Sequence, residues 1–563
     1  MKKILSVILA TILVLSAMPI AFAAEADGEL KIAVASDLHY SSSSEELERT
    51  NDDEIFWYAN RRAAMEEESS FIIDAFLKQC AEDDSVDYVL IAGDLTDSGK
   101  RRAEDHRAVA AKLRAFEETT GKDVFVINGN HDASETNGTS FAEFKEIYSE
   151  FGYDKALTSR EEDCSYTANL GDKYRLIALD SNSPSKSTED GMTADKLRWV
   201  KNQTEQAKKD GRYPIVMMHH NLLDHMPMQR IISRNFIVKF HNTTASLFAD
   251  WGVKVVISGH EHCSDVASFT SAAGNVIYDF ATTSLTMYPL SYRIFDFDDN
   301  EIRYSSELIR SIDTEALLAA QPALSKTQTD AMNENLNAYA KGFLKAGVKY
   351  RLERGLSTEK IGIDEKSPFY ELVKTATERL TELLNTPYEG ENGVNALAAK
   401  YNISLPETEY VNGWDIATEL VSAHYAGEES NTLESDEVTL LLKTAALILK
   451  EVPAVTADAT LLEAANSALG RTTGLASETA QLCSKLFGGV TAGEYFITAL
   501  VSPFLYEFAY DADGVNDNNG TLAGYGAESA NAKNLAAKLQ GIFEKLFTYI
   551  KLFFSVLAKA VRA

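Results

Sequence analysis

The stretch Tyr88–Asp97, which reads YVLIAGDLTD, contains the pattern on which the predicted fold depends. Its first five residues are apolar and rich in β-branched or aromatic side chains, which predicts a short, buried β-strand. Gly93 ends the apolar run, and two acidic residues, Asp94 and Asp97, follow it. The same order, an apolar run and then polar residues, recurs four more times in the first half of the chain.

Five predicted strands therefore end in polar residues. These ends are Asp37-Leu38-His39 after Leu30–Ser36, Gly93–Asp97 after Tyr88–Ala92, Gly129–Asp132 after Val124–Ile127, His219-His220 after Tyr213–Met218, and Gly259–His262 after Val253–Ser258. Amphipathic helical patterns separate the strands at Ile55–Lys78, Lys100–Glu118 and Thr193–Lys208. This alternation predicts a four-layer α/β sandwich, in which functional side chains collect at the carboxyl ends of the strands.

The composition limits the classes of partner. The chain has 563 residues, which is long enough for several domains. Acidic residues outnumber basic ones by 84 to 54, and the net charge is −30. This charge argues against a nucleic-acid duplex as a partner. An anionic substrate would need a local cation, such as a metal ion, at its binding site.

The amino terminus has the pattern of a secretory signal peptide. Lys2 and Lys3 precede an apolar run from Ile4 to Ala17, and Ala21-Phe22-Ala23 is a small-residue cleavage pattern. We expect residues 1–23 to be removed and the protein to be secreted or held at the cell surface. The alternative is a retained membrane anchor, because the apolar run can be extended to about 20 residues.

The pattern of strands and helices predicts two domains after the signal peptide. Residues 24–312 are predicted to form the α/β domain, which ends in three antiparallel strands at Val276–Phe280, Tyr292–Asp296 and Glu301–Ser306. Residues 313–530 have helical periodicity, which predicts an all-α domain of unknown role. Within it, Asp511–Gly520 is similar to a calcium loop, but Val515 occupies a ligand position, so a solvated linker is the better prediction.

The last segment, residues 531–563, is predicted to be a basic amphipathic helix. Its apolar stripe runs from Leu539 to Val561, and Glu544 is its one acidic residue after Lys533. Such a helix can make peripheral contact with an anionic membrane surface. The alternative is packing against the chain's own acidic helical domain.

Histidines are concentrated where the polar strand ends lie, because all but His424 fall between His39 and His262. If the ends meet at one edge of a parallel sheet, several carboxylates, an amide and several imidazoles share one crevice. Burying so many polar groups without cations would be prohibitively costly. Manganese, iron and zinc accept these ligand types, so the residues predict a site for divalent metal ions.

The order and spacing of the five polar blocks resemble the calcineurin-like metallophosphoesterase superfamily, whose motif reads D-x-H, G-D-x-x, G-N-H-[DE], a later His and G-H-x-H. The resemblance covers residues 30–310 and includes all five blocks. It implies a metal-dependent phosphoric ester hydrolase with two divalent metal ions (Mn, Fe or Zn), in which a hydroxide that bridges the ions attacks phosphorus in line.

The same resemblance implies a role for individual residues. The implied ligands are Asp37, His39, Asp94 and His262 for the first metal, and Asp94, Asn130, His219 and His260 for the second, with Asp94 bridging. His220 is the alternative to His219, because Asn221 replaces the proline of the family's usual x-Pro step. The implied catalytic residues are His131, as proton donor to the leaving group, and Asp97, as the carboxylate that orients His131. We expect Asp132 to hold its loop and Glu261 to face solvent.

Departures from the family motif bear on the substrate. Ser98 stands where phosphoprotein phosphatases carry Arg, and Leu95-Thr96-Asp97 lacks the Tyr ligand of purple acid phosphatases. The blocks GDLTDSG and GNHD, with Tyr288–Arg293 downstream, look more like the cyclic-nucleotide and glycerophosphodiester phosphodiesterase branch. We therefore expect hydrolysis of small-molecule or cell-envelope phosphodiesters. Two alternatives stay open: a nucleotidase or phosphomonoesterase, and a cell-envelope binding protein with a vestigial catalytic fold.

Overall fold

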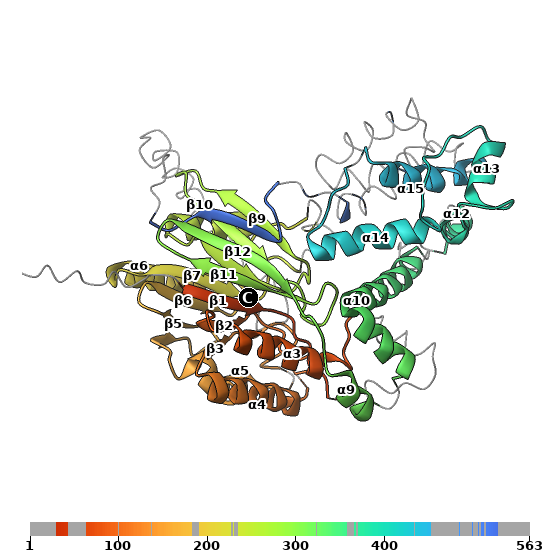
Figure 1. Cartoon of the computed structure of the whole chain (residues 1–563). Helices are drawn as coiled ribbons and strands as arrows, with labels where there is room; N and C mark the ends of the chain where they lie inside the picture. Colours follow the sequence, from red (N-terminus) through yellow and green to blue (C-terminus); the bar gives the residue numbers. More distant parts are fainter. Residues whose placement is uncertain are drawn as a thin grey trace, which may run out of the picture.

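The structure of the chain is a computed structural model (Figure 1). It describes residues 30–42, 63–99, 101–136, 138–182, 191–226, 229, 235–321, 324–356, 365–366, 370–432, 434–451, 484, 498, 505, 508–509, 511 and 514–526. The predicted signal peptide, residues 1–23, and the predicted terminal helix, residues 531–563, lie outside the described residues. Within the described part, every helix is too short or too polar to span a bilayer.

Two mixed β-sheets form the centre of the molecule (Figure 1). The first has the order β13-β12-β11-β1-β2-β3, with strands Asn519–Ala523, Glu301–Leu308, Ser291–Phe297, Leu30–Ala35, Tyr88–Ile91 and Asp123–Val126. The second has the order β4-β5-β6-β7-β8-β10-β9, with strands Thr158–Ser159, Tyr166–Leu170, Tyr174–Leu179, Tyr213–Met218, Val255–Ser258, Val276–Ala281 and Asp265–Thr270. Strands β1, β2 and β3 run parallel, as do β6, β7, β8 and β10, so each sheet gathers several carboxyl ends at one edge.

Helices cover the sheets and extend beyond them. The α/β part contains α3 (Ser69–Glu82), α4 (Ala103–Thr120), α5 (Phe141–Ile147), α6 (Ala194–Lys209) and α8 (His241–Asp250). The later part contains α9 (Thr314–Ala320), α10 (Lys326–Gly355), α12 (Tyr370–Asn385), α13 (Val394–Lys400), α14 (Gly413–Ala426), α15 (Asp436–Ala446) and α16 (Ile448–Glu451). Figure 1 shows α3, α4 and α5 grouped on one side of the sheets, while α10 leads away to α12–α15.

The main core lies between the two sheets and under α3 and α4. Phe280 of β10 and Phe295 of β11 meet across the sheets, with ring centroids 4.8 Å apart. Val34, Val89 and Ile73 belong to the same buried cluster. Burial of each such side chain contributes roughly 1.5–3 kcal/mol, so this cluster fixes the strand ends in place.

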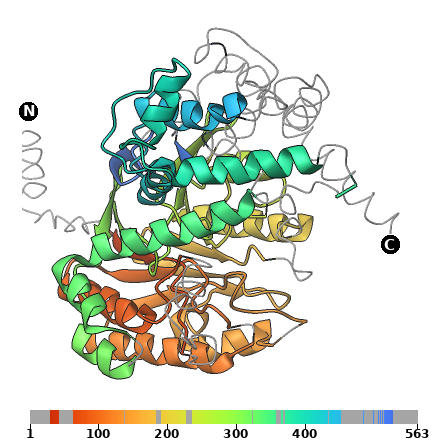
Figure 2. The same ribbon diagram turned by 90° about the vertical axis from the view of Figure 1, so that its right-hand side faces the viewer.

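The later helices share this core before they build their own. Leu336 and Leu344 of α10 and Val421 of α14 belong to the cluster that also contains the sheet residues. Helices α10 and α14 run side by side (Figure 2). A separate cluster, which includes Leu380 and Leu441, joins α12 to α15. The helical region is therefore packed onto the α/β domain through α10 and α14.

Two expectations about strands need correction. Residues 313–530 contain β13, which pairs antiparallel with β12 and completes the first sheet, so that segment is neither all-α nor a solvated linker at this point. Strand β13 is short, and its partner lies more than 200 residues earlier, which local periodicity cannot reveal. Strand β10 lies in the second sheet, where it pairs parallel with β8 and antiparallel with β9, so of the three expected antiparallel strands β11 and β12 pair with each other.

Candidate metal centre

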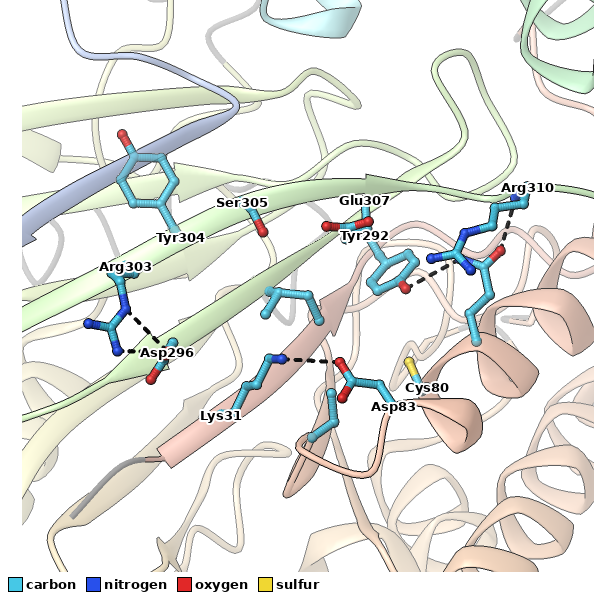
Figure 3. Close-up of a pocket in the computed structure, with 13 residues that line it drawn as sticks. Lys31, Cys80, Asp83, Tyr292, Asp296, Arg303, Tyr304, Ser305, Glu307 and Arg310 are labelled. Carbon is cyan, nitrogen blue, oxygen red and sulfur yellow. Dashed lines mark hydrogen bonds and ion pairs between the residues drawn. The ribbon is translucent and has the colours of Figure 1, made fainter. Parts of the chain in front are cut away.

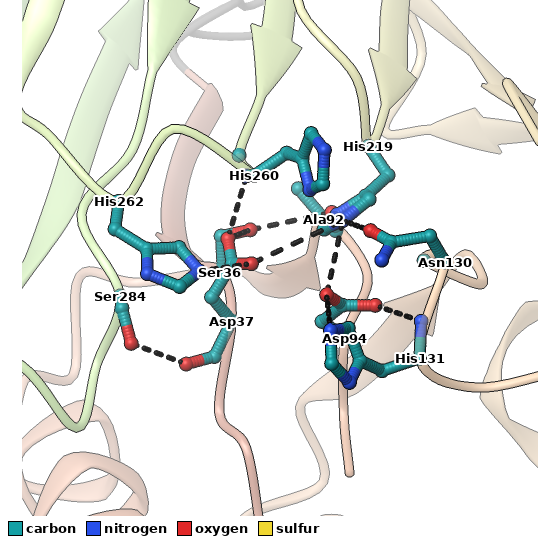
Figure 4. Close-up of polar contacts among 12 residues, drawn as sticks. Ser36, Asp37, Ala92, Asp94, Asn130, His131, His219, His260, His262 and Ser284 are labelled. Carbon is teal, nitrogen blue, oxygen red and sulfur yellow. Dashed lines mark hydrogen bonds and ion pairs between the residues drawn. The ribbon is translucent and has the colours of Figure 1, made fainter. Parts of the chain in front are cut away.

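The predicted ligands come together at the carboxyl ends of five strands (Figure 4). Strands β1, β2 and β3 of the first sheet and β7 and β8 of the second each lead into one ligand-bearing loop. The two sheets agree with the predicted four-layer α/β sandwich, and the site lies where the edges of the two sheets meet. The loops of the first sheet contribute carboxylates, an amide and an imidazole to the site, and the loops of the second sheet contribute imidazoles alone.

The backbone at these loops is held in an unusual conformation. Five ligand positions have left-handed backbone: Asp37 (φ 51°), His39 (φ 41°), Asp94 (φ 47°), His260 (φ 68°) and His262 (φ 65°). Such a conformation costs on the order of 1–3 kcal/mol for each residue other than glycine and clusters at functional sites. Hydrogen bonds from Asp37 N to Gly93 O (3.0 Å) and from His39 N to Asp94 O (3.1 Å) hold the first two loops together.

Two glycines of the motif allow the loops to approach closely. A Cβ at Gly129 would lie 2.1 Å from Asp94 Oδ1, and a Cβ at Gly259 would lie 1.9 Å from Ser36 Oγ. Any larger residue would push the carboxylates of Asp94 and Asp37 out of place. The glycine before each ligand block is thus a packing requirement of the site.

The first group of ligating atoms contains Asp37, His39 and His262, which are buried or nearly so. His262 Nε2 lies 3.1 Å from both Asp37 Oδ1 and His39 Nε2, and His39 Nε2 lies 3.7 Å from Asp37 Oδ1. Three potential ligand atoms from two sheets therefore face one point.

The second group contains Asp94, His219 and His260, with Asn130 beside them. His219 Nε2 lies 3.2 Å from Asp94 Oδ2 and 3.0 Å from Asn130 Oδ1. It also lies 3.9 Å from Asp37 Oδ1, so the two groups adjoin each other. The ligating atoms of Asp94 lie within 4.8 Å of those of His39 and also of those of His219 and His260, so Asp94 adjoins both groups. Figure 4 shows Asp94 beside His131.

Burial and charge act in opposite directions on the ionisable groups. Burial alone would raise the carboxyl pKa of Asp37 and Asp94, yet the pKa of both is lowered, by His262 and His219 for Asp37 and by His219 and His131 for Asp94. In turn, Asp94 and Asp37 outweigh burial and raise the pKa of His219 to about 10. The two carboxylates require positive charge nearby, which metal ions would supply.

The donor set fits a pair of divalent metal ions. Asp94 Oδ2, the atom expected to bridge, is buried and has no hydrogen-bond partner among the described residues. Burial, together with His220 and His219, holds the pKa of His260 well below its usual value, so His260 is neutral, as a metal ligand must be. A buried, unsatisfied carboxylate oxygen beside a neutral imidazole is an arrangement that a cation satisfies.

The structure distinguishes the two neighbouring histidines of β7. His219 donates Nδ1–H to Ala92 O at 2.9 Å, which leaves Nε2 as the atom that faces Asp94. The ring of His220 instead makes a 2.8 Å hydrogen bond between Nδ1 and Ser181 Oγ. The geometry therefore favours His219 over His220 as the ligand.

His131 and Asp97 are arranged differently from the expectation. His131 Nδ1 lies 2.6 Å from the backbone carbonyl oxygen of Asp97, so the main chain orients this ring. The Asp97 carboxylate places Oδ1 3.4 Å from His39 Nδ1. Despite burial, Asp97 and Asp94 raise the pKa of His39. Asp97 thus contacts a candidate ligand through its side chain and His131 through its backbone.

Two further acidic residues have structural roles. Asp132 accepts hydrogen bonds from the backbone N–H groups of Leu95 (3.2 Å), Thr96 (3.1 Å) and Gly129 (2.7 Å), so it holds two ligand loops together, as expected. The expectation that Glu261 faces solvent is wrong, because Glu261 is buried and accepts a 3.0 Å hydrogen bond from Gln229 Nε2.

Other contacts of the centre carry no signal in the local sequence. Phe236 stacks on the His260 ring with centroids 4.2 Å apart. Ser36 Oγ donates to Asp37 Oδ2 at 2.6 Å, and Ser284 Oγ donates to Asp37 O at 2.8 Å. Of these, only Ser36 is close in sequence to a recognised motif, so the others could be found only from the fold.

A cavity of about 370 Å³ lies elsewhere, between the end of α3 and the outward face of β11 and β12 (Figure 3). Its lining mixes both charges. Lys31 forms an ion pair with Asp83 at 3.1 Å, and Arg303 pairs with Asp296 at 2.8 Å. Because both of these cations already form ion pairs with carboxylates, they are poorly suited to bind an anionic substrate. The candidate site is therefore the ligand cluster at the strand ends.

Comparison with known proteins gives a family for this site. Residues 30–264 match the family model described as calcineurin-like phosphoesterase. Curated protein sequences gave no match. Similar solved structures include a dimetal phosphatase from Danio rerio (TM-score 0.36, 14% identity, 50% of this chain and 96% of that chain). A 5'-nucleotidase from Candida albicans is also similar (TM-score 0.27, 10% identity, 58% of each chain), as is a phosphopantetheinyl hydrolase from Mycobacterium tuberculosis (TM-score 0.24, 12% identity, 46% of this chain and 90% of that chain).

The family match defines the class of protein as a metal-dependent phosphoester hydrolase. The matched part of the chain, residues 30–264, is identified as a calcineurin-like phosphoesterase region. The candidate ligand groups around Asp37 and Asp94 agree with the two-metal dependence typical of that family.

Proposed function

We propose that the protein hydrolyses small-molecule or cell-envelope phosphodiesters outside the cell. The observation that carries this proposal is the convergence of seven potential ligand side chains in one buried site beside a more exposed histidine, His131. The ligands are Asp37, His39, Asp94, Asn130, His219, His260 and His262.

Each half of the site would hold one divalent metal ion. Asp37, His39 and His262 face the first position, Asn130, His219 and His260 face the second, and Asp94 serves both. When bound, the ions would neutralise the phosphoryl oxygens and lower the pKa of the attacking water. The ligand types at the site suit Mn, Fe or Zn.

His131 is the proposed proton donor to the leaving alkoxide. Its Nδ1–H donates to the carbonyl oxygen of Asp97, so Nε2 is the nitrogen that can take up a proton and release it. Nε2 lies 4.0 Å from Asp94 Oδ2, and the side chain is 26% exposed, in contrast to the buried Asp94. His131 therefore lies at the edge of the centre, where a leaving group can reach it.

Charge favours a diester over a monoester. A phosphodiester carries one negative charge near neutral pH, whereas a phosphomonoester carries close to two. None of the described contacts of the seven candidate ligands is made by a lysine or arginine, and the chain as a whole has net charge −30. A site with two metal ions and no lysine or arginine among its described contacts suits the less charged substrate.

The substrate class is tested by comparing bis-p-nitrophenyl phosphate with p-nitrophenyl phosphate on the mature, metal-loaded protein. Both release the same chromophore, so the ratio of kcat/KM reports the preference for diester or monoester. We expect the diester to be favoured by roughly tenfold or more, which is a difference of about 1.4 kcal/mol in the barrier. A preference for the monoester would overturn the diester proposal in favour of a phosphomonoesterase or nucleotidase.

Export and membrane contact are proposed from the two ends of the chain. Lys2 to Ala23 supports removal of a signal peptide, so amino-terminal sequencing of secreted protein should begin at Ala24. The basic stripe of residues 531–563 supports peripheral binding to anionic lipid. Co-sedimentation with anionic vesicles should decrease when residues 531–563 are deleted, and unchanged binding would contradict a membrane role.

A further inference from the structure

The loop from Gly259 to Asp265 supplies one candidate ligand to each half of the metal centre. His260 and His262 both have left-handed backbone, with φ of 68° and 65°. Residues held in this way persist only when their surroundings determine the conformation. The contacts that fix this loop therefore determine where both imidazoles lie.

Part of that support comes from the helical region. Ser264, two residues after His262, donates its backbone N–H to Tyr425 O at 3.1 Å. Tyr425 lies in the last turn of α14. Ser264 Oγ also lies 3.0 Å from Asn518 Oδ1, just before β13. Two segments that lie outside the family match thus hold the loop that carries His260 and His262.

Asn518 connects these segments to each other. While its Oδ1 contacts Ser264, its Nδ2 donates to Ala426 O at 2.7 Å and to Gly427 O at 3.0 Å. The carbonyl groups at the end of a helix lack partners within the helix, so Asn518 satisfies the end of α14. One side chain therefore joins the ligand loop, the helix end and the edge of the first sheet.

The residues at this junction are closely packed. Gly427 caps α14 with φ +62°, and a Cβ there would lie 2.5 Å from Ser264 O and 2.7 Å from Asp517 Cβ. On the other side, the buried guanidinium of Arg293 donates to Ser264 Oγ at 3.0 Å and to Asp517 O at 2.6 Å. Ser264 is held from both directions.

We propose that Asn518 is a positioning residue of the metal centre, which acts through Ser264 on the loop that carries His260 and His262. The helical region is then part of the metal-binding machinery, because α14 contacts the loop directly through Tyr425 O and a second time through Asn518. This inference rests on the proposed two-metal site, since it explains how two of the site's ligands are placed.

The test is a titration of the metal-free, full-length mature protein with Mn²⁺, followed by calorimetry. We expect Asn518→Ala to weaken Mn²⁺ binding by about 10–100-fold, as the loss of a group that orients a metal ligand does. The matched control is Asn519→Ala, because Asn519 is the exposed neighbour and its side chain contacts neither Ser264 nor α14 in the contacts described. This control should bind Mn²⁺ as the unsubstituted protein does. Excess Mn²⁺ should restore turnover to Asn518→Ala.

A second control separates positioning from general stability. Val438→Ala removes a methyl pair from the buried core around α15 and leaves the junction intact. It should lower the unfolding temperature without changing Mn²⁺ affinity. If Asn518→Ala does not fold, Ser264→Ala takes its place, and it removes the hydrogen bond to Asn518 together with the one from Arg293.

Equal Mn²⁺ affinity in Asn518→Ala and the unsubstituted protein would overturn the inference, as would an equal loss of affinity in Val438→Ala. Absence of Mn²⁺ and Zn²⁺ binding by the unsubstituted protein would instead overturn the two-metal site itself. The two failures are therefore distinguishable.

Discussion

In the described part of the chain, the candidate metal centre and a second buried cluster of histidine and aspartate resemble each other in composition. One is the candidate metal centre around Asp94 and His219. The other joins His225 to Asp265 and Asp279, with His225 Nε2 3.1 Å from Asp279 Oδ2. In both clusters two carboxylates outweigh burial and raise the pKa of the histidine to about 10.

The clusters differ in how completely their carboxylates are satisfied. Asp279 Oδ2 accepts hydrogen bonds from Leu222 N (2.6 Å) and Leu223 N (2.8 Å), and its Oδ1 accepts one from Ser258 Oγ (2.8 Å). Asp94 Oδ2 has no hydrogen-bond partner among the described residues. The two clusters therefore differ in the hydrogen bonds of their carboxylates and not in their residue types.

The largest expected effect comes from removing one carboxylate in each cluster. Asp94→Asn should abolish bound metal and lower kcat by more than the ~10²–10⁴-fold that loss of a general acid costs, because both halves of the centre share Asp94. Asp279→Asn should retain metal but destabilise the fold by about 3–5 kcal/mol, because it breaks a buried ion pair. Metal analysis and urea unfolding of the two variants check this contrast. Metal loss in Asp279→Asn with metal retained in Asp94→Asn would reverse the assignment.

His131→Ala is expected to have the next largest effect. The variant should keep its metal and lose about 10²–10⁴-fold in kcat for substrates with poor leaving groups, because their alkoxide needs a proton. The loss in kcat should be much smaller for nitrophenyl substrates, because nitrophenolate leaves without protonation. Turnover of alkyl and nitrophenyl diesters measures the difference, and equal losses for both would contradict the role of His131 as a proton donor.

Asp97→Asn tests the contact with His39. The variant should bind Mn²⁺ about 10–100-fold more weakly, because the carboxylate beside His39 Nδ1 is lost. With saturating Mn²⁺, its preference between good and poor leaving groups should be unchanged, since the backbone carbonyl still orients His131. A leaving-group dependence like that of His131→Ala would show that the Asp97 side chain acts on His131 instead.

The smallest effect is the pH dependence of the structural cluster. The folded-state pKa of His225, about 10, lies above its unfolded value of about 6.5, so the stability it contributes is complete below pH ~6.5 and is lost as pH rises towards 10. The loss can reach about 1.4 kcal/mol per pH unit for one proton. The free energy of unfolding of the metal-free protein, measured with urea, should fall more steeply between pH 7 and 9 for the unsubstituted chain than for His225→Gln. If the free energy of unfolding changed with pH in the same way for both proteins, His225 would not be held in its charged form.

Much of the catalytic domain could be predicted from the sequence, because its strands are short apolar runs with clear ends. Strand β7 forms at the predicted residues, and each end of β1, β2 and β3 lies within one residue of its predicted position. Strand β13 could not be predicted, since Asn519–Ala523 contains few strand-forming side chains and depends on pairing with β12. Its position at the edge of the first sheet is a tertiary property.

The residues that form the site could be predicted, but the directions of their side chains were less predictable. The spacing of Asp37, Asp94 and His262 around glycines and strand ends locates the ligand loops. It does not reveal that Asp97 directs its side chain to His39 and its carbonyl to His131, because both contacts cross between loops. Glu261 was placed wrongly for the same reason, since Gln229 covers it from another segment.

The most direct test of the account is the metal content of the purified, unsubstituted mature protein, measured per chain by mass spectrometry before and after chelation. The account predicts two divalent metal ions per chain, and loss of phosphodiester hydrolysis when they are removed. Protein that holds no metal and still hydrolyses phosphodiesters fully after chelation would contradict it.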